Sequence, residues 1–383
     1  MMKRITALLA AMTLLAVSPA QGGEPSKSTL GFDSETQLLR WMPRTWAALR
    51  LGSWNTMLQP WLPYKSGVIQ ALTKTNLDVL ALQEVWTDAA KNRILSDPII
   101  RDKYPYHYHA PAEQKRGACV AVPRFYQEDF ISCLTATGID TRTLEQPVTP
   151  VSNECKLQGT FLTLSSQACY SCIVNTLQER SPSFPALGVI ERCEEGDEVV
   201  EYAHGGSPGM LILSKRPLQE IEVVPYTTHQ IRRVIVYATV AGVRFAFVHL
   251  PLNYLAEIDS SLASFQRGPT QAELVQDLIA KRPDVVVGDF NSGPDYQPAG
   301  HNLLVANGYN PLFSKPTYCP QSTHATFPPC QVAPTLAPSV TGPASIDNVY
   351  INTNAGFCLP YTFANQPPVS DHIGVSALCG LRR

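Results

Sequence analysis

The sequence predicts an α/β fold in which mixed β-sheets are covered by helices on their outer faces. Short apolar runs with strand character alternate with segments of helical periodicity. Neighbouring apolar runs also read as a hairpin, so parallel and antiparallel pairs are expected in the same sheets. The 383 residues and 44% hydrophobic content suit a globular enzyme built as one large domain or two small ones.

The segment from Ala47 to about Tyr108 is predicted to form a strand, a helix and a second strand. Ala47–Leu51 and Leu77–Ala81 are apolar runs of strand length. Asn76 can end the helix between them. Three apolar residues share one face of that helix: Val68, Ile69 and Leu72.

The middle of the chain predicts further strands. Met210–Leu213 is a short apolar strand that follows the glycine-rich segment Gly205–Gly209. That segment lacks the Lys-Ser/Thr ending of a nucleotide P-loop, so its glycines are expected to let the backbone pass close to the site. Val234–Val240 and Val243–Val248 read as a hairpin with Ala241-Gly242 at its turn.

A helix and two strands are predicted in the last third. Thr270–Glu273 forms a capping box that opens the helix, and Lys281–Pro283 stops it. Strand Asp284–Val287 follows at once, and Ile373–Leu378 is the last predicted strand. The helix has one apolar face, made by Leu274, Val275, Leu278 and Ile279.

Two segments do not show this alternation of predicted strands and helices. Residues 117–200 contain six cysteines and show weak periodicity, which indicates an insertion that is cross-linked by disulfides and lies outside the core. Residues 316–344 are rich in Pro, Thr and Ser and read as a long loop.

All ten cysteines follow residue 20, and an even number in an exported protein predicts disulfides. We expect pairing within two groups. Cys169-Tyr170-Ser171-Cys172 could instead be half of a zinc site or a redox pair. The groups are Cys119, Cys133, Cys155, Cys169, Cys172 and Cys193, then Cys319, Cys330, Cys358 and Cys379.

Residues 1–20 are predicted to be a secretory signal peptide. Lys3 and Arg4 precede an apolar run, and small residues precede a cut near Ala20. The alternative is a membrane anchor, but this run is too short to span a bilayer and no later one reaches the required length. We therefore expect a secreted protein, extracellular or periplasmic, with one catalytic domain over 21–383 and no transmembrane segment. A monomer is expected.

Cleavage would remove two of the 30 basic residues and none of the 32 acidic ones, leaving a formal net charge of −4. This charge argues against nucleic-acid binding through a broad basic surface, although a local basic groove stays open.

Polar motifs follow the predicted strands and carry the chemistry. Carboxylate and amide oxygens can hold a hard ion such as Mg²⁺, and two imidazoles can handle protons. This set of carboxylate, amide and imidazole side chains is therefore typical of a phosphodiesterase that uses a hard divalent cation. The five motifs are Gly52–Asn55, Leu82–Val85, Val248–Leu250, Gly288–Asn291 and Ser370–His372.

Each candidate site residue could also have an ordinary structural role without any part in chemistry. Glu84 is the strongest candidate metal ligand, because a carboxylate at the end of a buried strand is costly without a cation or donor; the alternative is a salt-bridged rim residue. Asn55 alone would more often make a turn. Asp289 and Asn291 could form an ordinary turn, or alternation could aim both at the site with Phe290 in the core.

The histidines are weighed in the same way. A lone His249 on an apolar strand would more often be a core residue, and His204 could equally be a surface residue or a group near the substrate. Asp371-His372 places a carboxylate beside an imidazole of near-neutral pKa, which suits activation of water. Asp347 could orient His372 through its second ring nitrogen.

As a set, these motifs resemble the endonuclease/exonuclease/phosphatase superfamily, over roughly Ala47–Tyr108 and Gly205–Leu378. The resemblance implies a four-layer α/β sandwich, with two packed mixed sheets flanked by helices and the site at one edge. The cysteine-rich insert lies outside it.

The resemblance also implies roles. Mg²⁺, or another hard cation such as Mn²⁺ or Ca²⁺, would be bound by Glu84, with Asn55 nearby and Asp371 contributing. His372 paired with Asp347 would be the general base. The remaining roles are proton handling by Asp289 and steadying of the phosphate by Asn291 and His249.

Within the superfamily the chain is most similar to neutral sphingomyelinases. The similarity lies in Trp61–Ser66, Gln83–Trp86 and Gly209–Leu218. Trp61 would suit contact with a lipid surface, or it could be a buried staple. The expected substrate is therefore a phospholipid such as sphingomyelin at a membrane surface, with DNA as the alternative. A phosphatase or a non-catalytic binding protein on the same fold is a further reading.

Overall fold

The computed structural model describes the chain in segments, all of which belong to one compact unit, Arg44–Arg383. The predicted signal peptide, Trp61 and Asp371 lie outside the described residues, as do most of the cysteine-rich insert and of the proline-rich loop. The described residues are 45–58, 65–114, 116–117, 193, 199–200, 202, 204–228, 231–251, 269–318, 344–363, 370 and 372–383.

The first sheet has six strands in the order β13-β14-β1-β2-β6-β3. The central strand β1 runs parallel to β2 and antiparallel to β14, so the sheet is mixed as predicted. The strands are β1 (Trp46–Leu58), β2 (Val79–Val85), β3 (Tyr106–His109), β6 (Leu211–Ser214), β13 (Gly356–Phe363) and β14 (Gly374–Arg382).

The second sheet also has six strands, in the order β11-β12-β10-β9-β8-β7. Strands β9 and β10 are parallel, whereas β12 and β8 run antiparallel to their neighbours. The strands are β7 (Gln219–Thr228), β8 (Ile231–Val240), β9 (Val243–His249), β10 (Val285–Asp289), β11 (Tyr309–Pro311) and β12 (Asp347–Asn352). A separate two-stranded ribbon joins β4 (Arg116–Gly117) to β5 (Val199–Val200).

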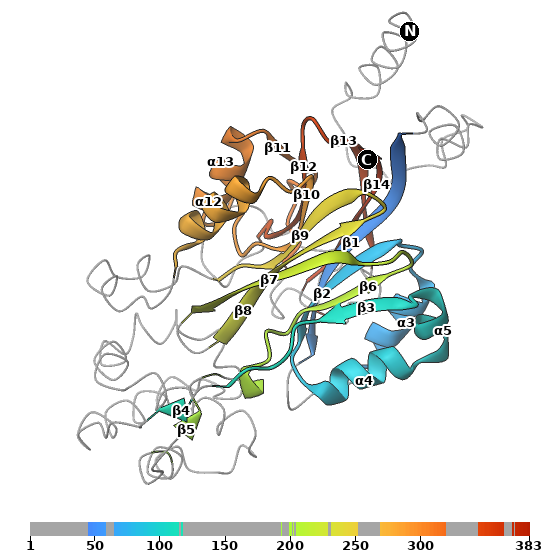
Figure 1. The fold of residues 1–383 in the computed structure, drawn as a ribbon, viewed down its shortest axis with the longest axis vertical. Coiled ribbons are helices and arrows are strands. Elements are labelled where there is room, and N and C mark those ends of the chain that lie inside the picture. Colours follow the sequence, from blue (N-terminus) through green and yellow to red (C-terminus); the bar gives the residue numbers. More distant parts are fainter. Residues whose placement is uncertain are drawn as a thin grey trace, which may run out of the picture. The chain divides into compact units, whose positions relative to one another are not determined.

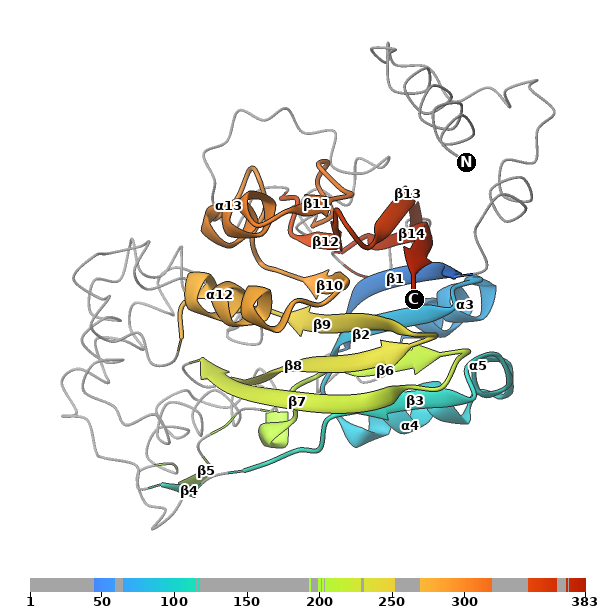
Figure 2. The same cartoon turned by 45° about the horizontal axis from the view of Figure 1, so that its top comes forward.

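Helices cover the outer face of each sheet, which completes the predicted four layers (Figures 1 and 2). The first sheet packs on α3 (Ser66–Lys74), α4 (Asp88–Ser96) and α5 (Pro98–Lys103) through a core that includes Trp54 and Leu82. The second packs on α12 (Gln271–Lys281) and α13 (Ala299–Ala306) through a core that includes Phe290.

A third core lies between the two sheets and combines residues of both, such as Leu51 and Val79 with Phe247 and Val287. Period-two alternation sends these side chains inward while their neighbours face the helices.

The predicted elements are present, but several strands extend further than the sequence indicated. β1 continues to Leu58, and Asn55, Glu84, His249 and Asp289 lie inside strands rather than after them. The hairpin and the capping box at Thr270 are confirmed. Gly288 permits the close packing of β10 on β9, because a Cβ atom there would lie 1.9 Å from the carbonyl oxygen of Val248.

One disulfide joins facing strands: Cys358 on β13 and Cys379 on β14 are register partners and are bonded. Both belong to the second predicted group. Cys193 is also disulfide-bonded. Pairing within the two groups otherwise stays a prediction.

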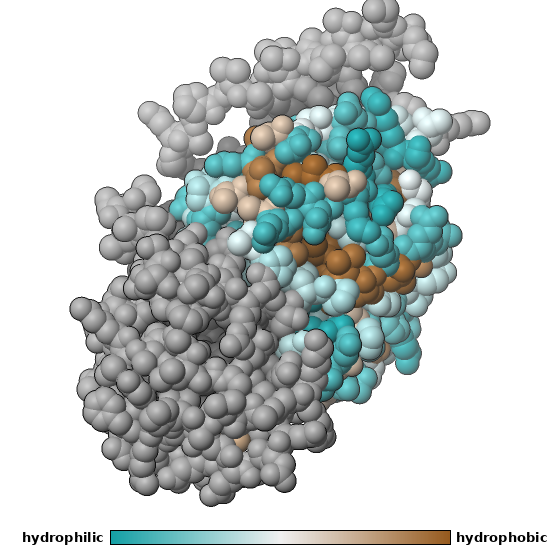
Figure 3. Space-filling view, turned by 60° about the vertical axis from the view of Figure 1, so that its left-hand side comes forward, coloured by the Kyte–Doolittle hydropathy of each residue, from teal (hydrophilic) through white to brown (hydrophobic). Residues whose placement is uncertain are grey.

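The surface mixes polar and apolar regions. On the face shown in Figure 3, hydrophobic residues gather in patches between hydrophilic ones. Among the described residues, no helix is both long and apolar enough to cross a membrane. The large hydrophobic side chains that are exposed in the described part of the chain are Ile99, Tyr106, Ile221, Val305, Leu359 and Tyr361.

Candidate functional site

Three neighbouring strands of the second sheet place polar side chains at the same level of one edge. Asp289, the last residue of β10, pairs in register with His249, the last residue of β9. It also pairs with Asp347, the first residue of β12. Because β9 and β10 are parallel and β12 is antiparallel, two strand ends and one strand beginning meet here. All three residues are almost completely buried.

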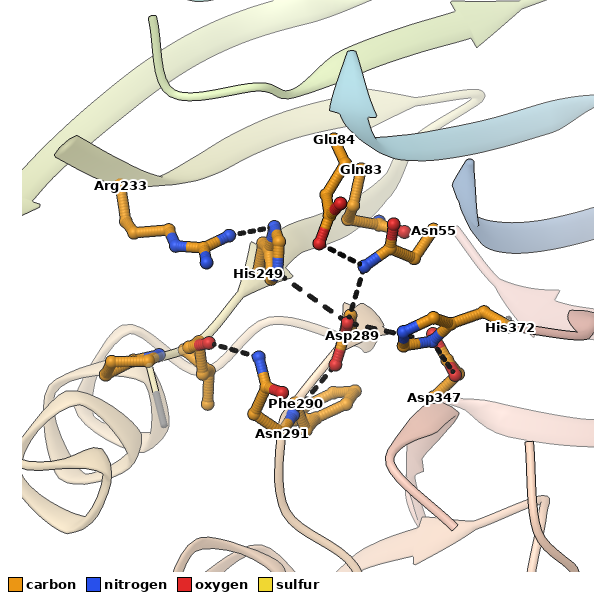
Figure 4. A network of polar contacts seen from close by, with 12 residues as sticks. Asn55, Gln83, Glu84, Arg233, His249, Asp289, Phe290, Asn291, Asp347 and His372 are labelled. Carbon is orange, nitrogen blue, oxygen red and sulfur yellow. Dashed lines mark hydrogen bonds and ion pairs between the residues drawn. The ribbon is translucent and has the colours of Figure 1, made fainter. Parts of the chain in front are cut away.

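The first sheet brings its own polar residues to this edge. Asn55 of β1 is the register partner of Gln83 in β2, and Glu84 follows. The Asn55 side-chain Nδ2 donates to Glu84 Oε1 and to Asp289 Oδ2, each at 3.0 Å (Figure 4). One amide therefore links the two sheets and brings both carboxylates together. Glu84 has φ +58, a conformation that L-residues rarely adopt and that is typical of functional sites.

His372 lies beside this cluster and is paired with Asp347. Its Nδ1 lies 2.8 Å from Asp347 Oδ2. The backbone of His372 is held by the indole N–H of Trp54, which donates to its carbonyl oxygen at 3.1 Å. Its own N–H donates to Ser370 Oγ, which in turn donates to the carbonyl oxygen of Asn55. The pairing proposed from the sequence is therefore present.

The carboxyl group of Asp289 has a perturbed pKa. Burial, followed by the nearby Asp347 carboxylate, raises the pKa of Asp289 to about 6, against the opposing effects of His372 and of hydrogen bonds from Asn55 and Asn291. Two buried carboxylates close together favour either a shared proton or a bound cation.

His249 is held on two sides. The guanidinium Nη1 of Arg233 contacts its Nδ1, and its Nε2 lies 3.6 Å from Asp289 Oδ2 (Figure 4). Burial, then the Arg233 charge and His372, put the pKa of His249 well below the usual value. The phenol of Tyr226 donates to the His249 carbonyl oxygen at 2.6 Å.

Asn291 is tied to both strand ends. Its N–H donates to Asp289 Oδ1 at 2.9 Å, and its side-chain Nδ2 donates to the Leu250 carbonyl oxygen at 2.8 Å. Phe290 points into the outer core, as expected. Gln271, at the start of α12, donates to the carbonyl oxygens of Phe290 and Asn291 at 3.2 and 2.9 Å, so this helix fixes the segment after β10.

His204 lies in the short 3₁₀ turn η2 (His204–Gly206) and is buried, not a surface residue. Its ring stacks on Trp86 with centroids 4.2 Å apart. Gly209 has φ +66, and a Cβ there would lie 2.6 Å from the Trp86 ring. This glycine therefore serves the packing of Trp86.

The donor set suits a hard cation. Ligand atoms of Asp289, Asp347 and His372 lie within 4.8 Å of one another. In addition, Asp347 Oδ1 is buried without a hydrogen-bond partner among the described residues. Buried carboxylate oxygens in excess of their donors are what Mg²⁺-type ions bind. The ligands proposed from the sequence include Asn55 and Glu84, which adjoin this group, and Asp371, which lies outside the described residues.

Three further residues at this edge were given no individual role from the sequence. Arg233 comes from the start of β8, and the Arg232-Arg233 pair opposite the strand ending at His249 was the available signal. Gln83 accepts from the Ser53 hydroxyl at 3.2 Å, and Trp86 lies under the Arg233 guanidinium, 5.3 Å from its ring centroid.

A comparison with protein families supports a site of this kind. The model of the Endonuclease/Exonuclease/phosphatase family matches residues 52–372. A sequence comparison with curated proteins finds no match.

Several solved structures are similar in fold. An endonuclease/exonuclease/phosphatase from Beutenbergia cavernae shares 16% identity over 87% of this chain and 72% of that chain, with a TM-score of 0.42. Sphingomyelinase C from Streptomyces griseocarneus shares 14% over 87% and 99%, with a TM-score of 0.42. The 3′-5′ exonuclease from Neisseria meningitidis shares 14% over 86% and 98%, with a TM-score of 0.44.

The family match covers every described polar residue of the site, from Asn55 to His372. The chain therefore belongs to the endonuclease/exonuclease/phosphatase family.

Proposed function

We propose that this protein is a secreted, Mg²⁺-dependent phosphodiesterase that hydrolyses a phospholipid such as sphingomyelin, in the manner of a phospholipase C. The observation that carries the chemistry is the Asp347–His372 pair at 2.8 Å beside the acidic cluster around Asp289.

His372 takes the role of general base. Asp347 can only accept a hydrogen bond when ionised, so the His372 proton lies on Nδ1 and Nε2 keeps its lone pair. A water molecule within reach of Nε2 can give up a proton as it attacks. Asp347 also compensates the positive charge that forms on the ring.

The reaction is an in-line displacement. The water oxygen forms a bond to phosphorus, its proton passes to His372 Nε2, and the bond from phosphorus to the leaving oxygen breaks. The leaving oxygen then takes up a proton from solvent. The second hydrogen of Asn291 Nδ2, whose first donates to Leu250, and the Nε2–H of His249 steady the phosphoryl oxygens as negative charge develops. Asp289 keeps both residues oriented.

Glu84, with Asn55 and Asp371, would hold the metal ion, and the Asp289 carboxylate adjoins this set. A divalent cation here supplies Lewis-acid stabilisation of charge on phosphoryl oxygens.

Charge favours a lipid over DNA. The net charge of −4 that follows signal cleavage does not provide the broad basic surface of a nuclease. Two arginines near the site have protein partners: Arg232 binds Glu113 and the Pro111 carbonyl, and Arg233 contacts His249. The sequence similarity to sphingomyelinases at Gly209–Leu218 adds support. An extracellular deoxyribonuclease is the second candidate, because the same chemistry serves both.

Export is supported by the sequence of residues 1–20 and by cysteine usage. The Cys358–Cys379 bond is of a kind that persists in oxidising compartments.

The test is a side-by-side assay of the purified mature protein on sphingomyelin vesicles, phosphatidylcholine vesicles and plasmid DNA in Mg²⁺. We expect release of the phosphorylated headgroup from a phospholipid and intact plasmid. Plasmid cleavage without lipid hydrolysis would replace the proposal with the nuclease. A His372→Ala preparation serves as the control for contaminating enzymes.

A further inference from the structure

The two buried histidines of the site have partners of opposite kind. His372 Nδ1 faces a carboxylate, Asp347 Oδ2 at 2.8 Å, whereas His249 Nδ1 faces the guanidinium of Arg233 (Figure 4). A carboxylate accepts a hydrogen bond, and a guanidinium can only donate one. The proton of each ring is therefore forced onto a different nitrogen.

We propose that Arg233 is a positioning residue that holds His249 as the neutral tautomer with its proton on Nε2, so that His249 serves this site as a hydrogen-bond donor and not as a base. The lone pair of His249 is on Nδ1, where it accepts from Arg233. The Nε2–H then faces the acidic cluster, with Asp289 Oδ2 3.6 Å away.

Arg233 is well placed for this role because its own position is fixed. Its side chain is buried, with 8% of its surface exposed. Its guanidinium carbon lies 5.3 Å from the centroid of the Trp86 ring, a distance typical of a cation–π contact. Trp86 is in turn stacked on His204 and packed against Gly209. The glycine-rich segment Gly205–Gly209 therefore has a function, because its packing holds in place the Trp86 ring on which Arg233 lies.

The imidazole of His249 is restrained at its backbone as well, by the hydrogen bond from Tyr226 to its carbonyl oxygen at 2.6 Å. Ring position and ring tautomer are therefore set by different residues. Removal of the Arg233 side chain is expected to let His249 populate both neutral tautomers while the backbone of β9 stays in place.

Because their tautomers differ, the two histidines can have different roles in the reaction. His372 offers a lone pair at Nε2 and can accept the proton of water, whereas His249 offers a proton at Nε2 and can bind a phosphoryl oxygen. This part of the inference rests on the proposed function, but the tautomer itself does not, and it can be measured without substrate.

The first measurement is a long-range ¹H–¹⁵N correlation spectrum of the protein labelled with ¹⁵N-histidine. The chain has eight histidines, and the signal of His249 is identified by its loss in His249→Gln. We expect a protonated Nε2 and a bare Nδ1 in the wild type, and a mixture of tautomers in Arg233→Met. A wild-type spectrum with the proton on Nδ1 of His249 would overturn the proposal, as would an unchanged tautomer in Arg233→Met.

The second measurement is a kinetic cycle on the same variants. Partners that orient a functional histidine typically contribute about 10–100-fold, so Arg233→Met should lower kcat by that order. In His249→Gln the side-chain amide donates without a tautomer to fix. Arg233→Met should then cost little further, and additive losses would contradict a role through His249.

Two further variants separate positioning from folding. Arg233→Lys keeps a donor and a charge, and should retain the wild-type tautomer. Arg232→Met removes the neighbouring arginine, which binds Glu113 and Pro111 instead, and should lower the melting temperature without changing the His249 spectrum. If the wild type hydrolysed no phosphodiester but showed the expected tautomer, the proposed function would fail and the positioning role would stand.

Discussion

At the residue scale, we propose that the polar side chains of the site divide between a base, a donor and a metal-binding group. Asp347 and His372 form the first, His249 with Arg233 the second, and Glu84 with its neighbours the third. Substitutions in the three groups should therefore change different kinetic quantities.

Substitution of His372 should affect turnover far more than substrate binding. Loss of a general base typically costs about 10²–10⁴-fold in rate, so His372→Ala should lower kcat by that order with a small change in KM. Asp347→Asn should cost less, because the imidazole stays present but loses the partner that sets its tautomer. Glu84→Gln should instead raise the Mg²⁺ concentration that gives half-maximal rate. Rates against Mg²⁺ at saturating substrate separate the three, and near-normal turnover in His372→Ala would place the base elsewhere.

The raised pKa of Asp289 predicts a pH-dependent stability. The folded state keeps this proton up to about pH 6, whereas the unfolded chain loses it near pH 4, so the contribution of Asp289 to stability falls as pH rises between those values. Asp289→Asn removes the titration. In EDTA, the difference in melting temperature between Asp289→Asn and the wild type should therefore shift in favour of the variant as pH rises from about 4 to about 6.

Added Mg²⁺ should oppose that trend, because a cation stabilises the ionised carboxylates. The stabilisation of the wild type by Mg²⁺ should therefore be larger above pH 6 than below it. A constant difference between the two proteins at every pH in EDTA would show that Asp289 does not titrate in this range.

At the element scale, α12 stabilises the site through its first residue. Gln271 donates to carbonyl oxygens of Phe290 and Asn291, and also to Pro251 after β9. Gln271→Met would leave these buried acceptors without this donor, at a cost of about 1–3 kcal/mol. We expect a lower free energy of unfolding in urea and a reduced kcat.

Thr270→Ala is the matched control for this helix. It removes the N-cap, whose hydroxyl accepts from the Glu273 N–H, and should cost about 1 kcal/mol. Its kcat should equal that of the wild type. Equal effects of both variants on kcat would mean that α12 acts through general stability alone.

The elements were predictable where the local pattern is strong. The α12 capping box and the hairpin of β8 and β9 each have their signal within a few residues. β7 was missed because its polar residues and Pro225 hide the pattern of a strand at the sheet edge. Strand ends were placed too early, since Thr56 and Met57 continue β1 although neither extends an apolar run.

At the scale of the whole molecule, the site exists because two sheets pack so that polar strand ends from both meet at one edge. The sequence could predict which residue types would gather, because each follows an apolar run of strand length. It could not predict that Asn55 bridges Glu84 to Asp289, or that Arg233 contacts His249, since these pairs are set by sheet packing and antiparallel register.

The proposed site is tested most directly by the metal dependence of phosphodiester hydrolysis by the mature protein. The rate on bis(4-nitrophenyl) phosphate would be measured after treatment with EDTA and again after addition of excess Mg²⁺. Because the site offers oxygen ligands to a hard cation, our expectation is that EDTA abolishes turnover and that Mg²⁺ restores it. Full activity in EDTA would contradict it.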